Sequence, residues 1–196
     1  MRVALLITLC VCLASGEPLV NTSFGQVQGI SSVAFRGVEA FLGIPYSIPP
    51  TGVRRWAAPV DWIAPYTSNP RVANLFGPSC IQDVSPGKAQ IWKSNVTSED
   101  CLTLNIFRPK SAAGASLLPV MTFIHGGSFE YGGSADYGGE ALAAKEGVIV
   151  ITLNYRLGAL GFMALREAHE AGKTAGGNYG LLDQAAALRW IKREAH

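Results

Sequence analysis

Two apolar runs, Val120–Ile124 and residues 148–153, constrain the fold of this chain more than any other feature. Both runs are rich in β-branched residues and have almost no polar positions. Such runs are typical of strands that are covered on both faces, as in a parallel sheet flanked by helices. The segment between them, residues 139–146, favours a short helix. This region therefore predicts a strand–helix–strand unit.

The first half of the chain has a different pattern, with short strands and many turns. Residues 25–30 and 32–35 predict two short strands, and residues 102–106 alternate apolar and polar side chains. That alternation predicts a half-buried strand near a sheet edge. Prolines and a glycine between residues 45 and 52 predict an irregular segment, because proline fixes φ and donates no hydrogen bond.

Two helices are predicted after the second apolar run. Residues 161–171 form one candidate, and Asn178 can cap the other. The apolar positions expected to face the core of this last helix follow a period close to 3.6 residues; they are Leu181, Leu182, Ala185, Leu188 and Ile191. Antiparallel strands thus come first, and a strand–helix–strand–helix order follows.

This order predicts an α/β fold with an incomplete sheet. Two or three parallel strands would leave the outer strand with an unpaired buried edge. The pattern of the last helix still continues at residue 196. We therefore expect residues 17–196 to form the N-terminal portion of a larger domain.

The N-terminus has the layout of a secretory signal peptide. Arg2 supplies a positive charge, residues 3–13 are apolar apart from Thr8, and small residues follow at 14–16. The alternative is a membrane anchor, but a bilayer span needs roughly 20 apolar residues. We expect residues 1–16 to be removed and the mature protein to be secreted, without a membrane span.

The charge balance gives no reason to expect nucleic acid or an anionic membrane as a partner. The chain has 16 basic and 14 acidic residues, and loss of Arg2 leaves 15 against 14. Apolar residues make up 48% of the chain, which is enough to bury a core.

Two cysteines, Cys80 and Cys101, remain once the predicted signal peptide is removed. An even pair in an oxidising compartment favours a disulfide, with two buried free thiols as the alternative. No histidine lies near them, so a zinc site is not expected. The glycosylation triplets at Asn21 and Asn95 agree with secretion, and Asn95 is favoured because it lies inside the proposed disulfide loop.

The segment His125–Phe129 (HGGSF) follows directly on a predicted buried strand. Glycine lets the backbone turn and brings N–H groups close to a ligand. Two such N–H groups aimed at one point can stabilise the negative oxygen of a tetrahedral acyl intermediate. The alternative is an ordinary glycine-rich turn between a strand and a loop.

The neighbouring motifs resemble those of the type-B carboxylesterase family, which includes the cholinesterases and their relatives. The similarity covers residues 19–196 and keeps the family's order. Besides the HGGSF segment, the motifs are residues 41–46 (FLGIPY) with 49–52 (PPTG), 76–80 (FGPSC), 99–105 (EDCLTLN), 154–158 (NYRLG) and 177–184 (GNYGLLDQ). The resemblance implies an α/β-hydrolase fold and a serine hydrolase that acts on carboxylic esters.

The resemblance also implies roles for particular residues. It pairs Cys80 with Cys101, and it implies the ion pairs Arg55–Glu99 and Arg156–Asp183, which we interpret as scaffold. The backbone N–H groups of Gly127 and Ser128 match the early part of the family's oxyanion hole. Trp92 lies near a tryptophan of the cholinesterase substrate gorge, but its spacing to Cys101 is one residue short, so a packing role is the alternative.

Two departures from the family pattern bear on activity. Many members have a third glycine where this chain has Ser128, and His-Gly-Gly-Ser also occurs in neuroligin-like members that bind partners without hydrolysis. Glu130 stands where cholinesterases carry an aromatic residue, which argues against a specialist for choline esters.

The nucleophile of this family sits in a Gly-x-Ser-x-Gly elbow, and residues 1–196 contain no such pentad. Residues 132–136 come nearest, but they end in aspartate and are interpreted as a loop. The serine, the acid and the histidine of the triad are therefore expected beyond His196, and this chain alone is expected to be inactive. His169 and His196 lie on helical candidates and are interpreted as surface residues, whereas His125 is expected to hold the loop.

We expect no cofactor and no metal, and a small carboxylic ester as the substrate of the complete protein. Two alternatives to an enzyme portion are considered. One is a catalytically inactive, adhesion-type relative, and the other is a short form that acts as a binding module.

Overall fold

The computed structural model describes residues 16–83, 96–112, 117–164, 166–170, 172 and 176–194. Residues 1–15 of the predicted signal peptide lie outside the described residues, and so do Trp92, Asn95 and His196. The same holds for the side chain of His169. The predictions made for these residues stay predictions.

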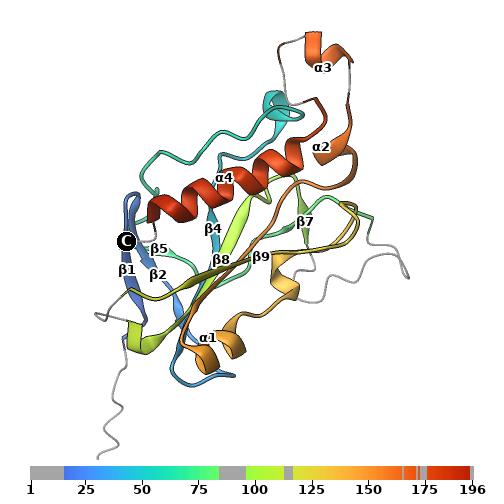
Figure 1. The fold of residues 1–196 in the computed structure, drawn as a ribbon. Helices are drawn as coiled ribbons and strands as arrows, with labels where there is room; N and C mark the ends of the chain where they lie inside the picture. The colour runs from blue at the N-terminus through green and yellow to red at the C-terminus, as the bar shows by residue number, and fades with distance from the viewer. Residues whose placement is uncertain are drawn as a thin grey trace, which may run out of the picture.

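A five-stranded sheet forms the centre of the fold (Figure 1). Its spatial order is β3 (Ile30–Ser31), β4 (Val38–Pro45), β8 (Thr103–Pro109), β10 (Ile149–Leu153) and β9 (Val120–Ile124). The pairs β3–β4, β4–β8 and β8–β10 are antiparallel, and β10–β9 is parallel. The predicted order, with antiparallel strands first and a strand–helix–strand unit after them, is confirmed.

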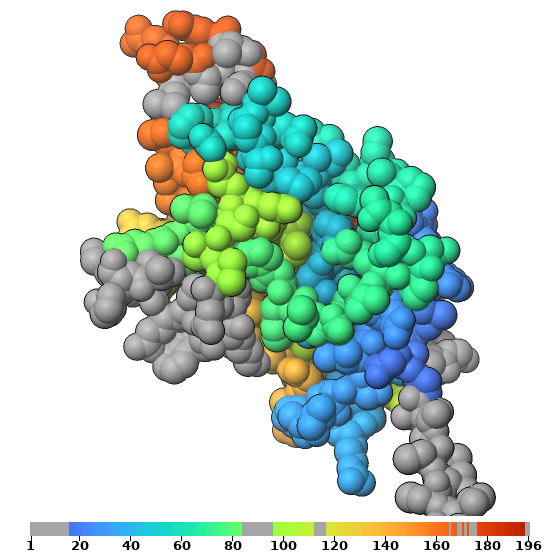
Figure 2. All heavy atoms as spheres, turned by 180° about the vertical axis from the view of Figure 1, so that it is seen from behind, coloured from blue at the N-terminus to red at the C-terminus, as the bar shows by residue number. Residues whose placement is uncertain are grey.

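Shorter elements surround this sheet. Two further small sheets are formed by β1 (Leu19–Thr22), β2 (Gly25–Gln28) and β5 (Arg71–Val72), and by β6 (Ser79–Cys80) with β7 (Thr97–Ser98). The 3₁₀ turns are η1 (Gly52–Arg54), η2 (Lys110–Ala112) and η3 (Ser134–Asp136). The segment between β4 and β6 spreads over the face of the molecule seen in Figure 2.

The α-helices are α1 (Glu140–Glu146), α2 (Gly158–Phe162), α3 (Arg166–Glu170) and α4 (Tyr179–Glu194). Helices α1 and α4 cover opposite faces of the sheet. This follows because neighbouring residues of a strand belong to two different apolar clusters. Phe41 and Ile151 belong to the cluster that includes Trp190 of α4. Leu42 and Val150 belong to the cluster that includes Ala143 of α1.

Gly139 explains how closely α1 approaches the sheet. A Cβ atom at this position would lie 2.5 Å from the ring of Phe107 and 2.8 Å from Val150. Only glycine leaves room for the start of the helix against β8 and β10 at this distance. The short connection from β9 through α1 to β10 therefore depends on a residue without a side chain.

The predicted position of residues 102–106 near a sheet edge is wrong. Strand β8 lies between β4 and β10, and its alternating polar residue Asn105 is buried. The Asn105 side chain accepts a hydrogen bond from Gly43 and donates to Ser134 and Thr152. Partners from distant segments thus allow a polar residue to be buried in a central strand.

Strand β9 was predicted to be covered on both faces, but it is the outer strand of the sheet. The side chains of Val120, Met121, Phe123 and Ile124 are between 36% and 49% exposed. An apolar run shows that a strand is suited to burial, but it does not show what covers the strand. Within the described residues, β9 has a neighbouring strand on one side only.

Two further local predictions need correction. Residues 32–35 form a turn in which the Ser32 hydroxyl accepts a hydrogen bond from the Phe35 N–H, so that strand β3 ends at Ser31. The single helix predicted over 161–171 is instead the pair α2 and α3. No described helix is long and apolar enough to cross a membrane.

The predicted core face of α4 is only partly right, since Ile191 is buried and Leu182 and Ala185 are half-buried. Leu181 and Leu188 are nearly half exposed, whereas the buried face consists of Tyr179, Gly180, Asp183, Ala186, Ala187, Trp190 and Ile191. Small residues let the helix backbone approach its neighbours; a Cβ atom on Gly180 would lie 2.5 Å from the carbonyl oxygen of Arg156. Apolar periodicity does not reveal a face of this kind.

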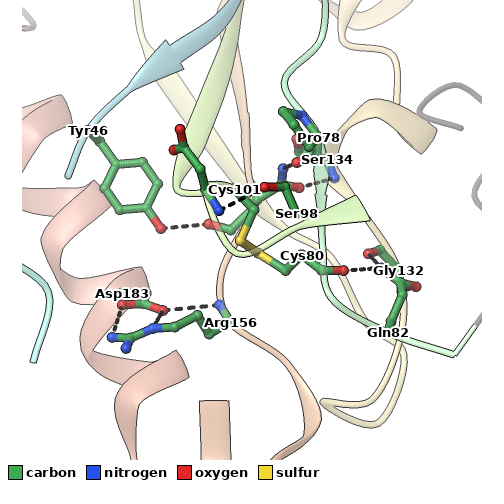
Figure 3. Close-up of a disulfide and its surroundings, with 12 residues drawn as sticks. Tyr46, Pro78, Cys80, Gln82, Ser98, Cys101, Gly132, Ser134, Arg156 and Asp183 are labelled. Atoms are coloured by element: carbon green, nitrogen blue, oxygen red, sulfur yellow. Dashed lines mark hydrogen bonds and ion pairs between the residues drawn. A yellow bond between two sulfur atoms is a disulfide. The ribbon is translucent and has the colours of Figure 1, made fainter. Parts of the chain in front are cut away.

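The Arg156–Asp183 ion pair is present and joins α4 to the segment after β10 (Figure 3). Arg156 donates to the carboxylate through Nε and Nη2, both at 2.7 Å, and through its backbone N–H at 3.0 Å. Both side chains are almost fully buried. Burial raises the pKa of Asp183, while the hydrogen bonds and positive charge of Arg156 oppose that rise.

We predict that Asp183→Ala lowers the free energy of unfolding by about 3–5 kcal/mol, because it leaves the Arg156 guanidinium buried without its partner. Urea denaturation of the unaltered chain and of Asp183→Ala measures the difference in the free energy of unfolding. Asp61→Ala is the matched control, since Asp61 pairs with Arg189 of the same helix in an exposed position and should cost at most about 1 kcal/mol. Equal losses in the two variants would contradict the prediction.

Candidate active-site loop

The loop of residues 125–133 begins where strand β9 ends. Strand β10 lies parallel to β9, so its own carboxyl end brings Asn154 and Tyr155 to the same edge of the sheet. In α/β sheets, this edge is where ligands bind. The parallel pair therefore places the loop predicted to carry oxyanion donors at the edge suited for a site.

Three consecutive residues of the loop have positive φ angles. These are Gly127 at +111°, Ser128 at +55° and Phe129 at +62°. The carbonyl oxygen of Gly127 accepts hydrogen bonds from the N–H groups of Glu130, at 2.9 Å, and Tyr131, at 3.1 Å. These bonds close the turn on itself. Ser128 therefore occupies a left-handed conformation that favours glycine, at a local cost of about 1–2 kcal/mol.

Gly127 cannot be replaced without moving the turn. A Cβ atom on this residue would lie 1.9 Å from the carbonyl oxygen of Tyr131. The neighbouring Gly126 is different, because a Cβ atom there would have no heavy atom within 4 Å. The two adjacent glycines thus have separate roles, and Gly127 is the one that the backbone requires.

The N–H groups of Gly127 and Ser128 donate no hydrogen bond to any residue that the structure describes. Gly127 is half-buried and Ser128 is exposed. Backbone donors that have no partner in the described part of the chain are available to a ligand with a negative oxygen.

Helix α2 supports the loop from one side. The carbonyl oxygen of Phe129 accepts a hydrogen bond from the N–H of Gly158 at 2.7 Å. The Phe129 ring lies 4.8 Å from that of Phe162 and presents an edge to Tyr155 at 6.4 Å. These contacts hold a residue that, like Ser128, has an unfavourable φ angle.

His125 is buried beneath the loop. Its ring stacks on Tyr155 with centroids 4.6 Å apart, and its Nδ1 lies 2.9 Å from the carbonyl oxygen of Gly126. The Tyr155 hydroxyl donates to the carbonyl oxygen of His125 at 2.8 Å. Burial lowers the pKa of His125, and the bond to Gly126 and the charge of Asp136 oppose that effect. These contacts support the predicted role of holding the loop.

A buried network of polar side chains fixes the far end of the loop, and the sequence interpretation missed it. The Asn154 side chain accepts from the N–H of Ser134 at 2.8 Å and donates to the carbonyl oxygen of Pro78 at 2.9 Å. Asn105 donates to the Ser134 hydroxyl at 3.0 Å. One signal in the sequence could have indicated this network. Each asparagine lies at or beside an apolar strand, where a buried amide without a hydrogen-bond partner would be costly.

The predicted disulfide between Cys80 and Cys101 is present, with Cα atoms 5.0 Å apart (Figure 3). The Arg55–Glu99 ion pair is also present, with two hydrogen bonds. Its hydrogen bonds to Arg55 lower the pKa of Glu99. A shallow hollow beside these residues is lined by neither Gly127 nor Ser128, so we do not assign it to the candidate site.

Of the remaining predicted positions, Asn21 lies outside the loop, whereas Glu130 belongs to it. Asn21 lies exposed on β1, where its side-chain oxygen accepts a weak hydrogen bond from Gln26 at 3.3 Å. Glu130 is exposed at the turn. Among the described residues, no group of three or more His, Cys, Asp and Glu side chains could hold a metal ion.

We predict that protonation of His125 destabilises the fold. Because its folded-state pKa is lowered, the unfolded chain binds the proton more readily below the ordinary pKa of about 6.5. The stability that neutral, buried His125 contributes is present above about pH 6.5 and is lost as the pH falls through the lowered pKa of the folded state. Urea denaturation at pH 7.5 and 5.5 measures the loss. His125→Phe keeps a ring against Tyr155 but cannot be protonated, so its stability should depend less on pH; an unchanged dependence would contradict the prediction.

Known proteins resemble this chain over nearly all of its length. The model of the carboxylesterase family matches residues 16–196. Cocaine esterase of Oryctolagus cuniculus is 42% identical over 189 residues, which are 91% of this chain and 34% of that protein. Pyrethroid hydrolase Ces2a of Mus musculus is 40% identical over 188 residues, which are 91% of this chain and 32% of that protein.

Solved structures agree with these similarities. A structure of PNB esterase superimposes with a TM-score of 0.79 at 40% identity, over 91% of this chain and 35% of that one. EstA of Aspergillus niger gives a TM-score of 0.73 at 37% identity, over 92% and 33%. The chain spans about a third of the length of these relatives. The matched residues and the shared α/β-hydrolase fold show that this chain belongs to the carboxylesterase family.

Proposed function

We propose that this chain supplies the early half of the oxyanion hole of a carboxylic-ester hydrolase. The observation that carries the proposal is the turn of Gly127 and Ser128. The two residues follow a sheet strand and have positive φ angles. Their adjacent N–H groups have no acceptor within the described residues. The relatives named cocaine esterase and pyrethroid hydrolase support the same reaction class.

In the proposed reaction, a serine outside residues 1–196 attacks the ester carbonyl carbon. Its hydroxyl proton passes to a histidine, and the carbonyl oxygen becomes negative as the tetrahedral intermediate forms. The N–H groups of Gly127 and Ser128 donate to that oxygen, together with the N–H of the residue after the serine. The alcohol then leaves with the proton, and water releases the acid from the acyl-enzyme in a second, equivalent step.

The groups around the turn have supporting parts in this proposal. His125 is buried, is held between Tyr155 and Gly126, and has a lowered pKa, so it is assigned to positioning and not to proton transfer. The Asn105 and Asn154 network holds Ser134, at the end of the loop. Preorganised donors of this kind need not reorient as the charge develops.

The transcript beyond codon 196 tests the proposal first. We expect it to encode a Gly-x-Ser-x-Gly pentad within roughly one strand length after α4, because the elbow follows a strand. A continuation with another residue in place of the serine would contradict the hydrolase proposal and favour an inactive, adhesion-type relative.

Gly127→Ala in the product of the complete transcript should lower kcat for a p-nitrophenyl ester by about 10²–10³. The added Cβ atom would collide with the carbonyl oxygen of Tyr131 and displace the N–H groups of the turn. Gly126→Ala is the matched control, since it adds the same atom where the structure leaves space, and it should retain most of its activity. Equal activity in the two variants would contradict the assignment of Gly127.

A further inference from the structure

Gln82 connects the disulfide to the end of the candidate oxyanion loop (Figure 3). Its side-chain amide donates to the carbonyl oxygen of Gly132 at 2.8 Å and accepts from the N–H of the same residue at 2.9 Å. It also donates to the carbonyl oxygen of Cys80 at 3.0 Å. The Gln82 side chain thereby pairs with both the N–H and the carbonyl oxygen of Gly132, and it is also bound to the carbonyl oxygen of Cys80.

Gln82 is held in place by the elements that precede it. Cys80 is buried, belongs to β6, and is joined by the disulfide to Cys101. Strand β6 pairs with β7, and Cys101 lies two residues before the central strand β8. The Gln82 amide is therefore attached to the core of the molecule.

Gly132 is in direct contact with the beginning of the loop. It has a φ of +114°, and a Cβ atom there would lie 2.7 Å from Nδ1 of His125 and 2.9 Å from the carbonyl oxygen of Gly126. The two ends of the loop thus lie against each other at this residue. The preceding residue, Tyr131, carries the carbonyl oxygen with which a Cβ atom on Gly127 would collide, and its N–H donates to the carbonyl oxygen of Gly127.

A continuous chain of contacts therefore runs from Gln82 through Gly132 and Tyr131 to Gly127. We propose that Gln82 is a positioning residue that fixes the direction of the Gly127 and Ser128 N–H groups. The catalytic meaning of this role depends on the proposed function, whereas the structural coupling does not.

Glutamine is chemically suited to this position. It supplies two donors for the carbonyl oxygens of Gly132 and Cys80 and one acceptor for the Gly132 N–H. Glutamate has the same length and keeps the acceptor, but as a carboxylate it has no donor and faces two carbonyl oxygens. Methionine fills a similar volume with neither group. The series Gln, Glu, Met therefore removes the interactions stepwise.

NMR of the disulfide-bonded chain tests the proposal without any substrate. In Gln82→Glu and Gln82→Met we expect the amide resonances of Gly127, Ser128 and Gly132 to shift. In Gln82→Met we also expect hydrogen exchange at Gly132 to become about tenfold faster or more, since the acceptor of its N–H is lost. The amides of α4 should keep their wild-type shifts. Gln26→Glu is the matched control, because Gln26 makes one weak side-chain bond on β2.

A second measurement needs no variant. In the unaltered chain, the side-chain amide protons of Gln82 should exchange with solvent more slowly than those of Gln26, because both Gln82 donors are engaged.

Three results would overturn the proposal. The first is unchanged Gly127 and Ser128 resonances in Gln82→Met, and the second is a uniform change across the loop and α4, which would indicate a general structural role. The third is equal exchange of the Gln82 and Gln26 side-chain amides. If the proposed function alone is wrong, the selective shifts should still be observed, but the complete product should have no esterase activity.

Discussion

The parallel pairing of β9 with β10 is the constraint on which the rest of this structure depends. Residues Ile149–Leu153 pair in register with Val120–Ile124, and the short helix α1 crosses between the two strands. This pairing brings the ends of both strands to one edge of the sheet. His125 and Tyr155 therefore meet as a stacked pair, and the loop that follows His125 begins from a fixed point.

The conformation of that loop is unfavourable by itself, so its surroundings have to maintain it. Ser128 and Phe129 both have positive φ angles, which side-chain-bearing residues rarely adopt. Three sets of contacts offset this local cost. They are the closed turn at Gly127, the hydrogen bond from Gly158 to Phe129, and the polar side chains that hold Gly132 and Ser134. Strain retained among so many fixing contacts is typical of functional sites.

Local patterns in the sequence predicted the parts of the fold that depend on neighbouring residues. The two apolar runs indicated the β9–α1–β10 unit, and the HGGSF segment indicated the candidate loop. The place of β8 in the centre of the sheet could not be predicted, because Asn105 is satisfied by Gly43, Ser134 and Thr152, which are all distant in sequence.

The same reason applies to α4 and to Gln82. Asp183 is buried because Arg156 reaches it from the end of β10, so a charged residue lies on a face that apolar periodicity alone excludes. Gln82 carries no motif, and its partner Gly132 is 50 residues away. Resemblance to a family supplied the Arg156–Asp183 pair, whereas the contacts of Gln82 became visible only in three dimensions.

The most direct test of the central claim is a crystal structure of the product of the complete transcript after reaction with a p-nitrophenyl phosphonate. The phosphoryl oxygen of the bound inhibitor stands in for the oxyanion of the tetrahedral intermediate. We predict that this oxygen lies about 2.7–3.1 Å from the backbone nitrogens of both Gly127 and Ser128. An oxygen more than about 3.5 Å from both nitrogens would contradict it.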